Sequence, residues 1–106
     1  MSSTPVSHRA VRLATAFVRR VFVGRVPRLF DAEFYLRMNR DVARHGIDPF
    51  LHYAWRGAAQ GRNPSEDFDT RFYLEQSGPT RLDPVRHYLR VGARAGHDPN
   101  PAFNSL

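Results

Sequence analysis

Two stretches of the chain place apolar residues at the spacing of a helical stripe. The stripe uses positions i, i+3, i+4 and i+7, filled by Phe50, Tyr53, Ala54 and Gly57 in one stretch and by Val85, Tyr88, Leu89 and Gly92 in the other. This spacing brings side chains to one face of an α-helix. No stretch shows the sustained alternation of apolar and polar residues that marks a half-buried strand. The pattern therefore predicts an all-α fold, with Tyr53 and Tyr88 at packing positions.

Four aspartates mark expected helix starts, namely Asp31, Asp48, Asp69 and Asp83. A carboxylate at an N-cap accepts hydrogen bonds from the unpaired backbone N–H groups of the first turn. Proline follows Asp48 and Asp83 directly, and it suits the first helical position because its fixed φ is already helical. At Asp31 and Asp69, flanking Phe and Tyr residues fit a hydrophobic staple instead.

These elements recur as a tandem helical repeat of residues 30–65 and 66–102. Both copies contain Phe-Asp, Phe-Tyr-Leu, Asp-Pro, His-Tyr, two glycines four residues apart and a proline. The second copy is three residues shorter, and the loss falls between Leu74 and Asp83. Residues 103–106 resemble the start of a truncated third copy. Because neighbouring units of such a repeat bury each other's apolar faces, the two copies are expected to stack.

The repeated glycines have two alternative roles. Gly57 and Gly92 either end a helix in the left-handed conformation or permit the close approach of a neighbouring helix. Gly61 and Gly96 are candidates for the same stop one turn later.

Residues 9–29 are predicted to form a basic amphipathic helix after a disordered stretch of residues 1–8. Apolar residues fill about half of the helical wheel over residues 9–23, and arginines group on the other half. The stretch is too short and too often interrupted by arginine to span a bilayer. Composition alone also resembles a mitochondrial presequence, but no spacer separates it from the repeats. The candidate membrane- or partner-contact residues are Arg9, Arg12, Phe17, Arg19, Arg20 and Phe22.

The net charge of +6 belongs to this N-terminal stretch. Six of the sixteen arginines and no acidic residue precede residue 30, and the ten remaining arginines match the ten acidic residues that follow. Three interpretations stay open. The helix lies on an anionic membrane surface, packs its apolar face on the repeats as an end cap, or binds nucleic acid. The third ranks last because the repeats add no net positive charge and contain no known nucleic-acid-reading motif.

Catalytic and metal chemistry find little support. The absence of cysteine excludes disulfides, zinc–thiolate sites and thiol nucleophiles. His52 and His87 each follow a capping aspartate by four residues and precede a tyrosine. Their occurrence in both copies favours a structural role, with hydrogen bonds to an adjacent turn or a neighbouring unit, over an acid–base set. The other histidines lack metal-ligand spacing. We therefore expect no catalytic, metal or cofactor-binding residues.

Trp55 departs from the packing pattern because Arg90 takes its place in the second copy. This exchange predicts an exposed position. Trp55, Arg56 and Arg62 are the candidate glycan or partner surface, and a glycan-binding module that uses Trp55, Tyr53 and neighbouring arginines is the alternative function.

The first copy reads FDxxFYL…DxxxxGIDPFLHYxxxGxxxGRNPS and resembles the tandem accessory repeats of bacterial surface-polysaccharide glycosyltransferases. The match covers residues 30–104, and the second copy departs from it by lacking the Asn-x-Asp-Val stretch and by carrying His97 instead of Arg. The resemblance implies a non-catalytic scaffold, because the family's catalytic residues have no counterparts in this chain. It also implies a cytoplasmic location at the periphery of the inner membrane, with a glycosyltransferase or the membrane surface as partner. A stacking repeat also allows oligomers.

Overall fold

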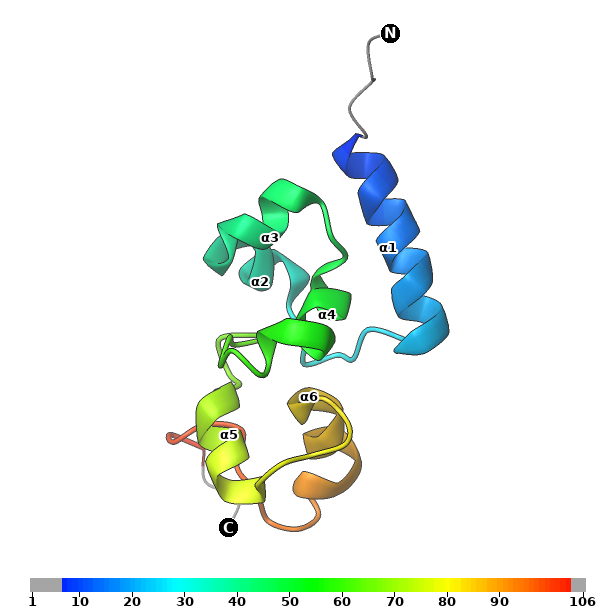
Figure 1. The fold of residues 1–106 in the computed structure, drawn as a ribbon. Helices are drawn as coiled ribbons and strands as arrows, with labels where there is room; N and C mark the ends of the chain where they lie inside the picture. Colours follow the sequence, from blue (N-terminus) through cyan, green and yellow to red (C-terminus); the bar gives the residue numbers. More distant parts are fainter. Residues whose placement is uncertain (1–6, 104–106) are drawn as a thin grey trace, which may run out of the picture.

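The computed structural model describes residues 7–103, and these are predominantly helical (Figure 1). The elements are α1 (His8–Phe22), α2 (Ala32–Met38), α3 (Arg40–His45), α4 (Pro49–His52), the π-helical turn η1 (Tyr53–Gly57), α5 (Thr70–Ser77), α6 (Pro84–His87) and the π-helical turn η2 (Tyr88–Gly92). No strand forms within residues 7–103. An isolated bridge between Ser65 and Phe68 closes the turn at residues 66–67.

Two of the predicted boundaries reach beyond the described residues. Disorder was expected for residues 1–8, of which residues 1–6 lie outside the described part of the chain. Ser7 caps α1, and His8 is its first residue. The expected third copy also lies outside them, except for Phe103. We refer below to residues 30–65 as the first segment and to residues 66–102 as the second segment.

Each of the four aspartates caps a helix. Their Oδ1 atoms accept hydrogen bonds of 2.8–3.0 Å from the backbone N–H groups three residues later, those of Phe34, Leu51, Phe72 and Arg86. The carboxylates therefore satisfy donors that a free helix end would leave unpaired. The staple geometry is also present, with ring centroids 5.3 Å apart for Phe30 and Tyr35.

The first segment contains a helix that the two-helix pattern did not predict. α3 begins after Asn39, whose side-chain amide donates a 2.8 Å hydrogen bond to the Tyr35 carbonyl and so closes α2. The second segment has a loop over residues 78–82 in the corresponding place, where its sequence is three residues shorter. The two segments therefore share their caps but not all of their helices.

Aromatic rings form the core of each segment. In the first, the rings of Phe30, Tyr35, Phe50 and Tyr53 lie with centroids 5.1–6.3 Å apart. In the second, those of Phe68, Tyr73 and Tyr88 lie 5.2–5.9 Å apart. Figure 1 shows the second segment stacked below the first along one axis. Edge-to-face and tilted ring pairs at these separations stabilise small cores beyond simple area burial.

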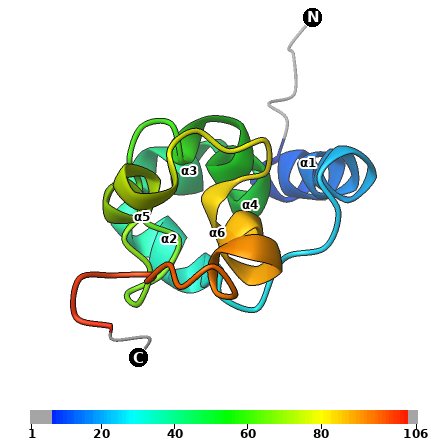
Figure 2. The same ribbon diagram turned by 90° about the horizontal axis from the view of Figure 1, so that it is seen from below.

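Helix α1 lies beside α3 and α4 at the flank of the first segment (Figures 1 and 2). The Thr15 hydroxyl accepts a 2.8 Å hydrogen bond from the backbone N–H of Asp48, and Arg19 Nε lies 3.4 Å from Asp48 Oδ2. The His8 backbone packs on Gly46 closely enough that a Cβ there would be 2.8 Å from the His8 carbonyl oxygen. Within the described residues, no helix has the length and apolarity needed to cross a bilayer.

Candidate functional site

A tyrosine and a histidine pair inside each segment. The Tyr35 hydroxyl is 2.7 Å from His52 Nδ1, and the Tyr73 hydroxyl is 2.6 Å from His87 Nδ1. The sequence predicted structural histidines that would contact an adjacent turn or a neighbouring unit. The partner is instead a tyrosine from the first helix of the same segment, α2 for Tyr35 and α5 for Tyr73. The tyrosine that directly follows each histidine takes no part in the pair.

The π-helical turns bring a glycine under each tyrosine hydroxyl. Because the hydrogen bonds of such a turn join residues five apart, Gly57 comes to the side of the helix that carries His52. A Cβ on Gly57 would lie 2.0 Å from the Tyr35 hydroxyl oxygen, and one on Gly92 would lie 2.0 Å from that of Tyr73.

This close approach decides between the two roles expected for the repeated glycines. Neither Gly57 nor Gly92 has a positive φ, so the left-handed alternative is wrong for both. The group that approaches them is a tyrosine hydroxyl and not a helix backbone. Among the four repeated glycines, Gly61 and Gly96 have a positive φ, of 76° and 86°.

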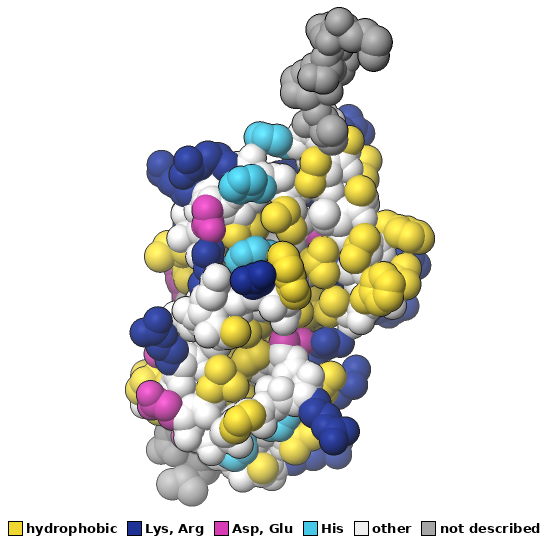
Figure 3. All heavy atoms as spheres, in the orientation of Figure 1, with side chains coloured by type: hydrophobic (Ala, Val, Ile, Leu, Met, Phe, Trp, Pro, Cys, Tyr) yellow, Lys and Arg dark blue, Asp and Glu magenta, His cyan; other side chains and the backbone are white. Residues whose placement is uncertain are grey.

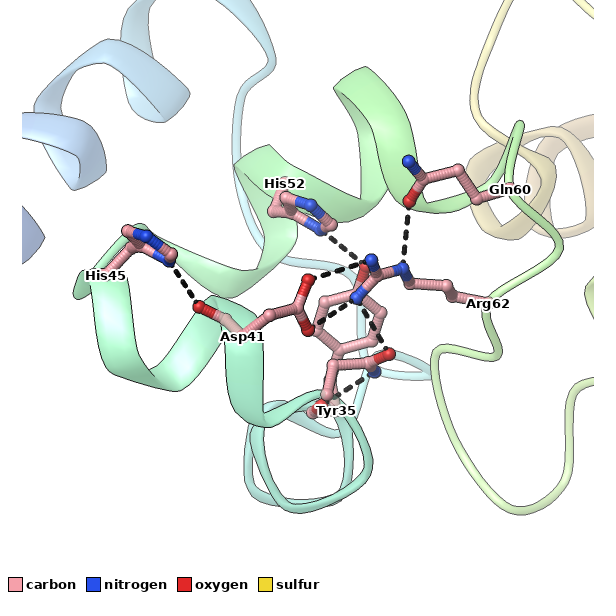
Figure 4. Close-up of polar contacts among 7 residues, drawn as sticks. Tyr35, Asp41, His45, His52, Gln60 and Arg62 are labelled. Atoms are coloured by element: carbon pink, nitrogen blue, oxygen red, sulfur yellow. Dashed lines mark hydrogen bonds and ion pairs between the residues drawn. The ribbon is translucent and has the colours of Figure 1, made fainter.

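Arg62 lies beside the Tyr35–His52 pair of the first segment (Figure 4). Its two Nη atoms bind the two carboxylate oxygens of Asp41 at 2.9 Å each, Nη1 also donates to Asn39 at 3.0 Å, and Nε donates to Gln60 at 2.9 Å. This bidentate contact lowers the pKa of the Asp41 carboxyl to about 2. The Arg62 guanidinium is therefore held by Asp41, and the expectation that Arg62 joins Trp55 in a ligand-binding surface stays a prediction.

The second segment has no counterpart of this ion pair. His97 stands in the place of Arg62, and the loop over residues 78–82 replaces α3, which carries Asp41. Among the described residues, His97 Nδ1 is buried without a hydrogen-bond partner. The two segments thus share the tyrosine–histidine pair and differ in the residue beside it, which is Arg62 in the first segment and His97 in the second.

Burial fixes the protonation of the first pair. It raises the pKa of the Tyr35 hydroxyl well above its ordinary range, and burial together with the nearby Arg62 charge lowers the pKa of His52. At neutral pH the tyrosine therefore keeps its proton and the imidazole is uncharged. Burial likewise raises the pKa of Tyr73 to about 12. Tyr35 is 0% and His52 8% exposed, so the pair lies inside the first segment and is shielded from solvent.

We expect acidification to weaken the fold through His52. The unfolded imidazole takes up a proton near pH 6.5, whereas the folded one does so only at lower pH. The unfolded state therefore binds more protons, and the free energy of unfolding falls as the pH drops from 7 to 5. Urea unfolding at pH 7, 6 and 5 measures this slope, which should flatten in His52→Gln.

The matched control for this slope is His45→Gln, because His45 is exposed. Measurements at pH 5 and above are unaffected by Asp41. The contribution of its carboxylate to the free energy of unfolding is lost only as the pH falls from about 4 towards 2. An unchanged slope in His52→Gln would contradict the assignment.

The apolar side of α1 faces solvent. Phe17 is 69% and Phe22 81% exposed, and Leu13 and Val21 share this exposure at 64% and 59%. Figure 3 shows hydrophobic side chains gathered over α1. Arg9, Arg12 and Arg20 are also exposed, whereas Arg19 is held by Asp48 and donates to the Gly24 carbonyl at 3.0 Å. Of the six predicted contact residues, all but Arg19 are therefore open to a partner.

The end-cap interpretation has to be corrected in one respect. α1 does lie against the first segment, but it contacts Asp48 through Thr15 and Arg19, on its polar edge. Leu13, Phe17, Val21 and Phe22, which were expected to pack on the repeats, are exposed instead. A polar edge that anchors the helix leaves the apolar face available.

The candidate glycan surface is smaller than expected. Trp55 is 64% exposed, and the Arg56 guanidinium lies 4.8 Å from the centroid of its ring. Tyr53 is fully buried, and its hydroxyl lies 2.9 Å from Thr70 Oγ1. Trp55 and Arg56 are thus the exposed members of this surface, Arg62 is half-buried, and burial removes Tyr53 from it.

Comparisons with protein families, curated proteins and solved structures found no match to this chain. The geometry described above therefore carries the functional interpretation. The residues that sequence reasoning missed are Thr15, which positions α1, and Asp41, which holds Arg62. Each acts through a partner more than twenty residues away, so no local pattern marks it.

Proposed function

We propose that this chain is a non-catalytic helical-repeat module that docks on an anionic membrane surface through α1. The observation that carries the proposal is the exposed apolar face of α1, from Leu13 to Phe22, on a helix with four arginines and no acidic residue. A helix of this kind lies in the membrane interface with its apolar face among the acyl chains and its arginines at the headgroups.

We also propose that the two segments are copies of one unit that form a short stack behind α1. The recurrence of aspartate caps, tyrosine–histidine pairs and close-packed glycines at corresponding positions supports this interpretation. In this arrangement the stack is the scaffold, and α1 is its attachment to the membrane.

Two forces add in such docking. Transfer of apolar surface from water contributes about 25 cal/mol per Å², which favours insertion of Phe17 and Phe22. Each arginine near an anionic surface contributes about 1 kcal/mol. The first contribution persists in salt, whereas the second is screened. Vesicle binding at low and high salt can therefore separate the apolar contribution from the arginine contribution.

The biological setting follows only from the resemblance of the repeat. We propose that the module serves bacterial surface-polysaccharide assembly on the cytoplasmic side of the inner membrane, where a glycosyltransferase would be its protein partner. The repeat pattern from Phe30 to Pro64 supports this context.

Vesicle sedimentation tests the docking. We expect the full chain to bind phosphatidylglycerol-containing vesicles and to bind phosphatidylcholine vesicles much more weakly. Replacement of Arg9, Arg12 and Arg20 by Gln should weaken binding to the anionic vesicles on the order of 100-fold, at about 1 kcal/mol for each arginine.

The matched control carries the same charge change away from α1, at the exposed residues Arg40, Arg81 and Arg94. This variant should retain most of the binding. An equal loss in both triple variants would show that net charge alone drives binding, and no binding of the unmodified chain to anionic vesicles would reject the proposal.

A further inference from the structure

A surface hollow of about 360 Å³ follows the end of α1. One wall is formed by residues 23–27, which include Arg25, and the other by Arg86, Leu89 and Arg90 of the second segment. Its volume lies near the lower end of the range of about 300–1,000 Å³ that is typical of small-molecule sites. Among the described residues, no Asp or Glu lines it. We call it the arginine hollow, and its lining suits a small ligand with negative charge.

The three arginines of this hollow differ in how they are held. The Arg86 guanidinium is fixed, because its Nε binds Asp83 Oδ2 and its Nη1 donates to the Val23 carbonyl at 2.6 Å. Its Nη2 makes no hydrogen bond within residues 7–103. Arg25 and Arg90 are exposed and form no ion pair in the same part of the chain. Asp83 therefore balances the charge of Arg86, whereas the charges of Arg25 and Arg90 are unbalanced.

Apolar side chains line the arginine hollow together with these cations. They include Val26, which is 43% exposed, and the half-buried Leu89. Arginine binds phosphate oxygens through paired N–H donors and stays charged at any physiological pH. A free phosphate ion would use the arginines alone. A phosphate that is esterified to an apolar group would use both kinds of side chain.

The arginine hollow lies next to the exposed apolar face of α1. Val23, the C-cap of α1, lines it, and Phe22 directly before is 81% exposed. Arg25 is three residues after Phe22, so their Cα atoms are within about 11 Å of each other. On the face shown in Figure 3, basic side chains lie below the hydrophobic ones gathered over α1. An interfacial helix buries its apolar face by about 5–10 Å, so docking of α1 brings the hollow within reach of lipid headgroups.

We propose that the arginine hollow binds the phosphate headgroup of an anionic phospholipid. Arg25 and Arg90 donate to the phosphate oxygens, Arg86 supplies a fixed third donor, and the glycerol backbone lies against Val26 and Leu89. The choice of a lipid over free phosphate rests on the proposed docking through α1. The site adds recognition of one headgroup to a helix that any anionic surface attracts.

A lipid monomer tests the site without a membrane. Dihexanoylphosphatidylglycerol below its critical micelle concentration offers the headgroup but no interface for α1. We expect the ¹⁵N-labelled full chain to bind it, with saturable shifts of the arginine Nε–H resonances of Arg25 and Arg90. Dihexanoylphosphatidylcholine should bind more weakly because its choline is repelled by the arginines. Inorganic phosphate should also bind more weakly because it lacks the apolar contact.

The double variant Arg25→Gln, Arg90→Gln locates the contact. It should weaken binding of the phosphatidylglycerol monomer roughly tenfold for each arginine removed, since each loses a charged hydrogen bond. The matched control is Arg28→Gln, Arg94→Gln, which makes the same charge change at exposed residues close by that do not line the hollow. The control should bind the monomer as the unmodified chain does.

Three results would overturn the proposal. Equal affinity for inorganic phosphate and for the phosphatidylglycerol monomer would assign the hollow to a free phosphate. An equal effect of the two double variants would show that the lining arginines have no special role. Sedimentation with anionic vesicles by a chain that does not bind the monomer would reject the site and leave docking through α1 standing. Binding of the monomer without binding to vesicles would instead reject the docking and support the site.

Discussion

Gly57→Ala should lower the free energy of unfolding by about 2–4 kcal/mol, even though alanine is the better helix former. In an unobstructed helix this change would stabilise the protein by up to about 1 kcal/mol. Here the added Cβ would stand 2.0 Å from the Tyr35 hydroxyl oxygen and 3.2 Å from Tyr35 Cζ. Tyr35 is 0% exposed, so its ring is enclosed by other groups of the protein. Overpacking of about 1–3 kcal/mol then adds to the loss of the buried hydrogen bond with His52.

A double-mutant cycle with Tyr35→Phe separates these causes. The single change Tyr35→Phe leaves His52 Nδ1 without its partner and should cost about 1–3 kcal/mol. In that background the nearest clashing atom is absent, so Gly57→Ala should cost less than half of what it costs in the parent chain. Urea unfolding of the four proteins measures the cycle. Equal costs in both backgrounds would mean that the hydroxyl is not what excludes a side chain from residue 57.

The helix starts could be predicted from the sequence because their chemistry is local. An aspartate at the N-cap finds its donor three residues away, as Asp31 does at Phe34 and Asp48 at Leu51. A proline after the cap adds a second local signal at Asp48. Short-range geometry of this kind does not depend on the rest of the fold, so the residue pattern is enough to place it.

The clusters inside the segments could not be predicted because their partners are distant. Tyr35 and His52 are seventeen residues apart, and their contact depends on a π-helical turn that brings Gly57 beneath the hydroxyl. Similarly, α3 forms only in the segment that retains Asn39 and Asp41. The spacing of apolar residues says which face of a helix is buried, but it does not select π over α hydrogen bonding.

The orientation of α1 illustrates the same limit. A helical wheel separates its apolar and arginine-rich sides, and both membrane docking and end capping use the apolar side. The deciding group is Thr15, a polar residue between the two sides, which binds the backbone of Asp48. Since Asp48 also caps α4, one aspartate fixes both a helix start and the position of α1. The exposed apolar face is a consequence of that contact.

The double variant Phe17→Ser, Phe22→Ser should weaken binding to anionic vesicles by a factor on the order of 100 to 10,000. Both side chains are mostly exposed in the free protein, at 69% and 81%, so their transfer into the acyl region buries surface that water covers before docking. Burial of a phenylalanine side chain contributes about 1.5–3 kcal/mol, and every 1.4 kcal/mol is a tenfold change in affinity. Sedimentation with phosphatidylglycerol-containing vesicles measures the loss.

The matched control replaces two exposed apolar residues that lie outside α1, Met38 and Trp55, each 64% exposed. Met38→Ser, Trp55→Ser should bind vesicles as the unmodified chain does, and circular dichroism should show that both double variants keep their helices. In high salt the arginine contribution is screened, so the difference between the two variants should persist there while all binding weakens. If the α1 variant binds as well as the control, then the apolar face does not enter the membrane, and the exposure of Phe17 and Phe22 must be explained by a protein partner.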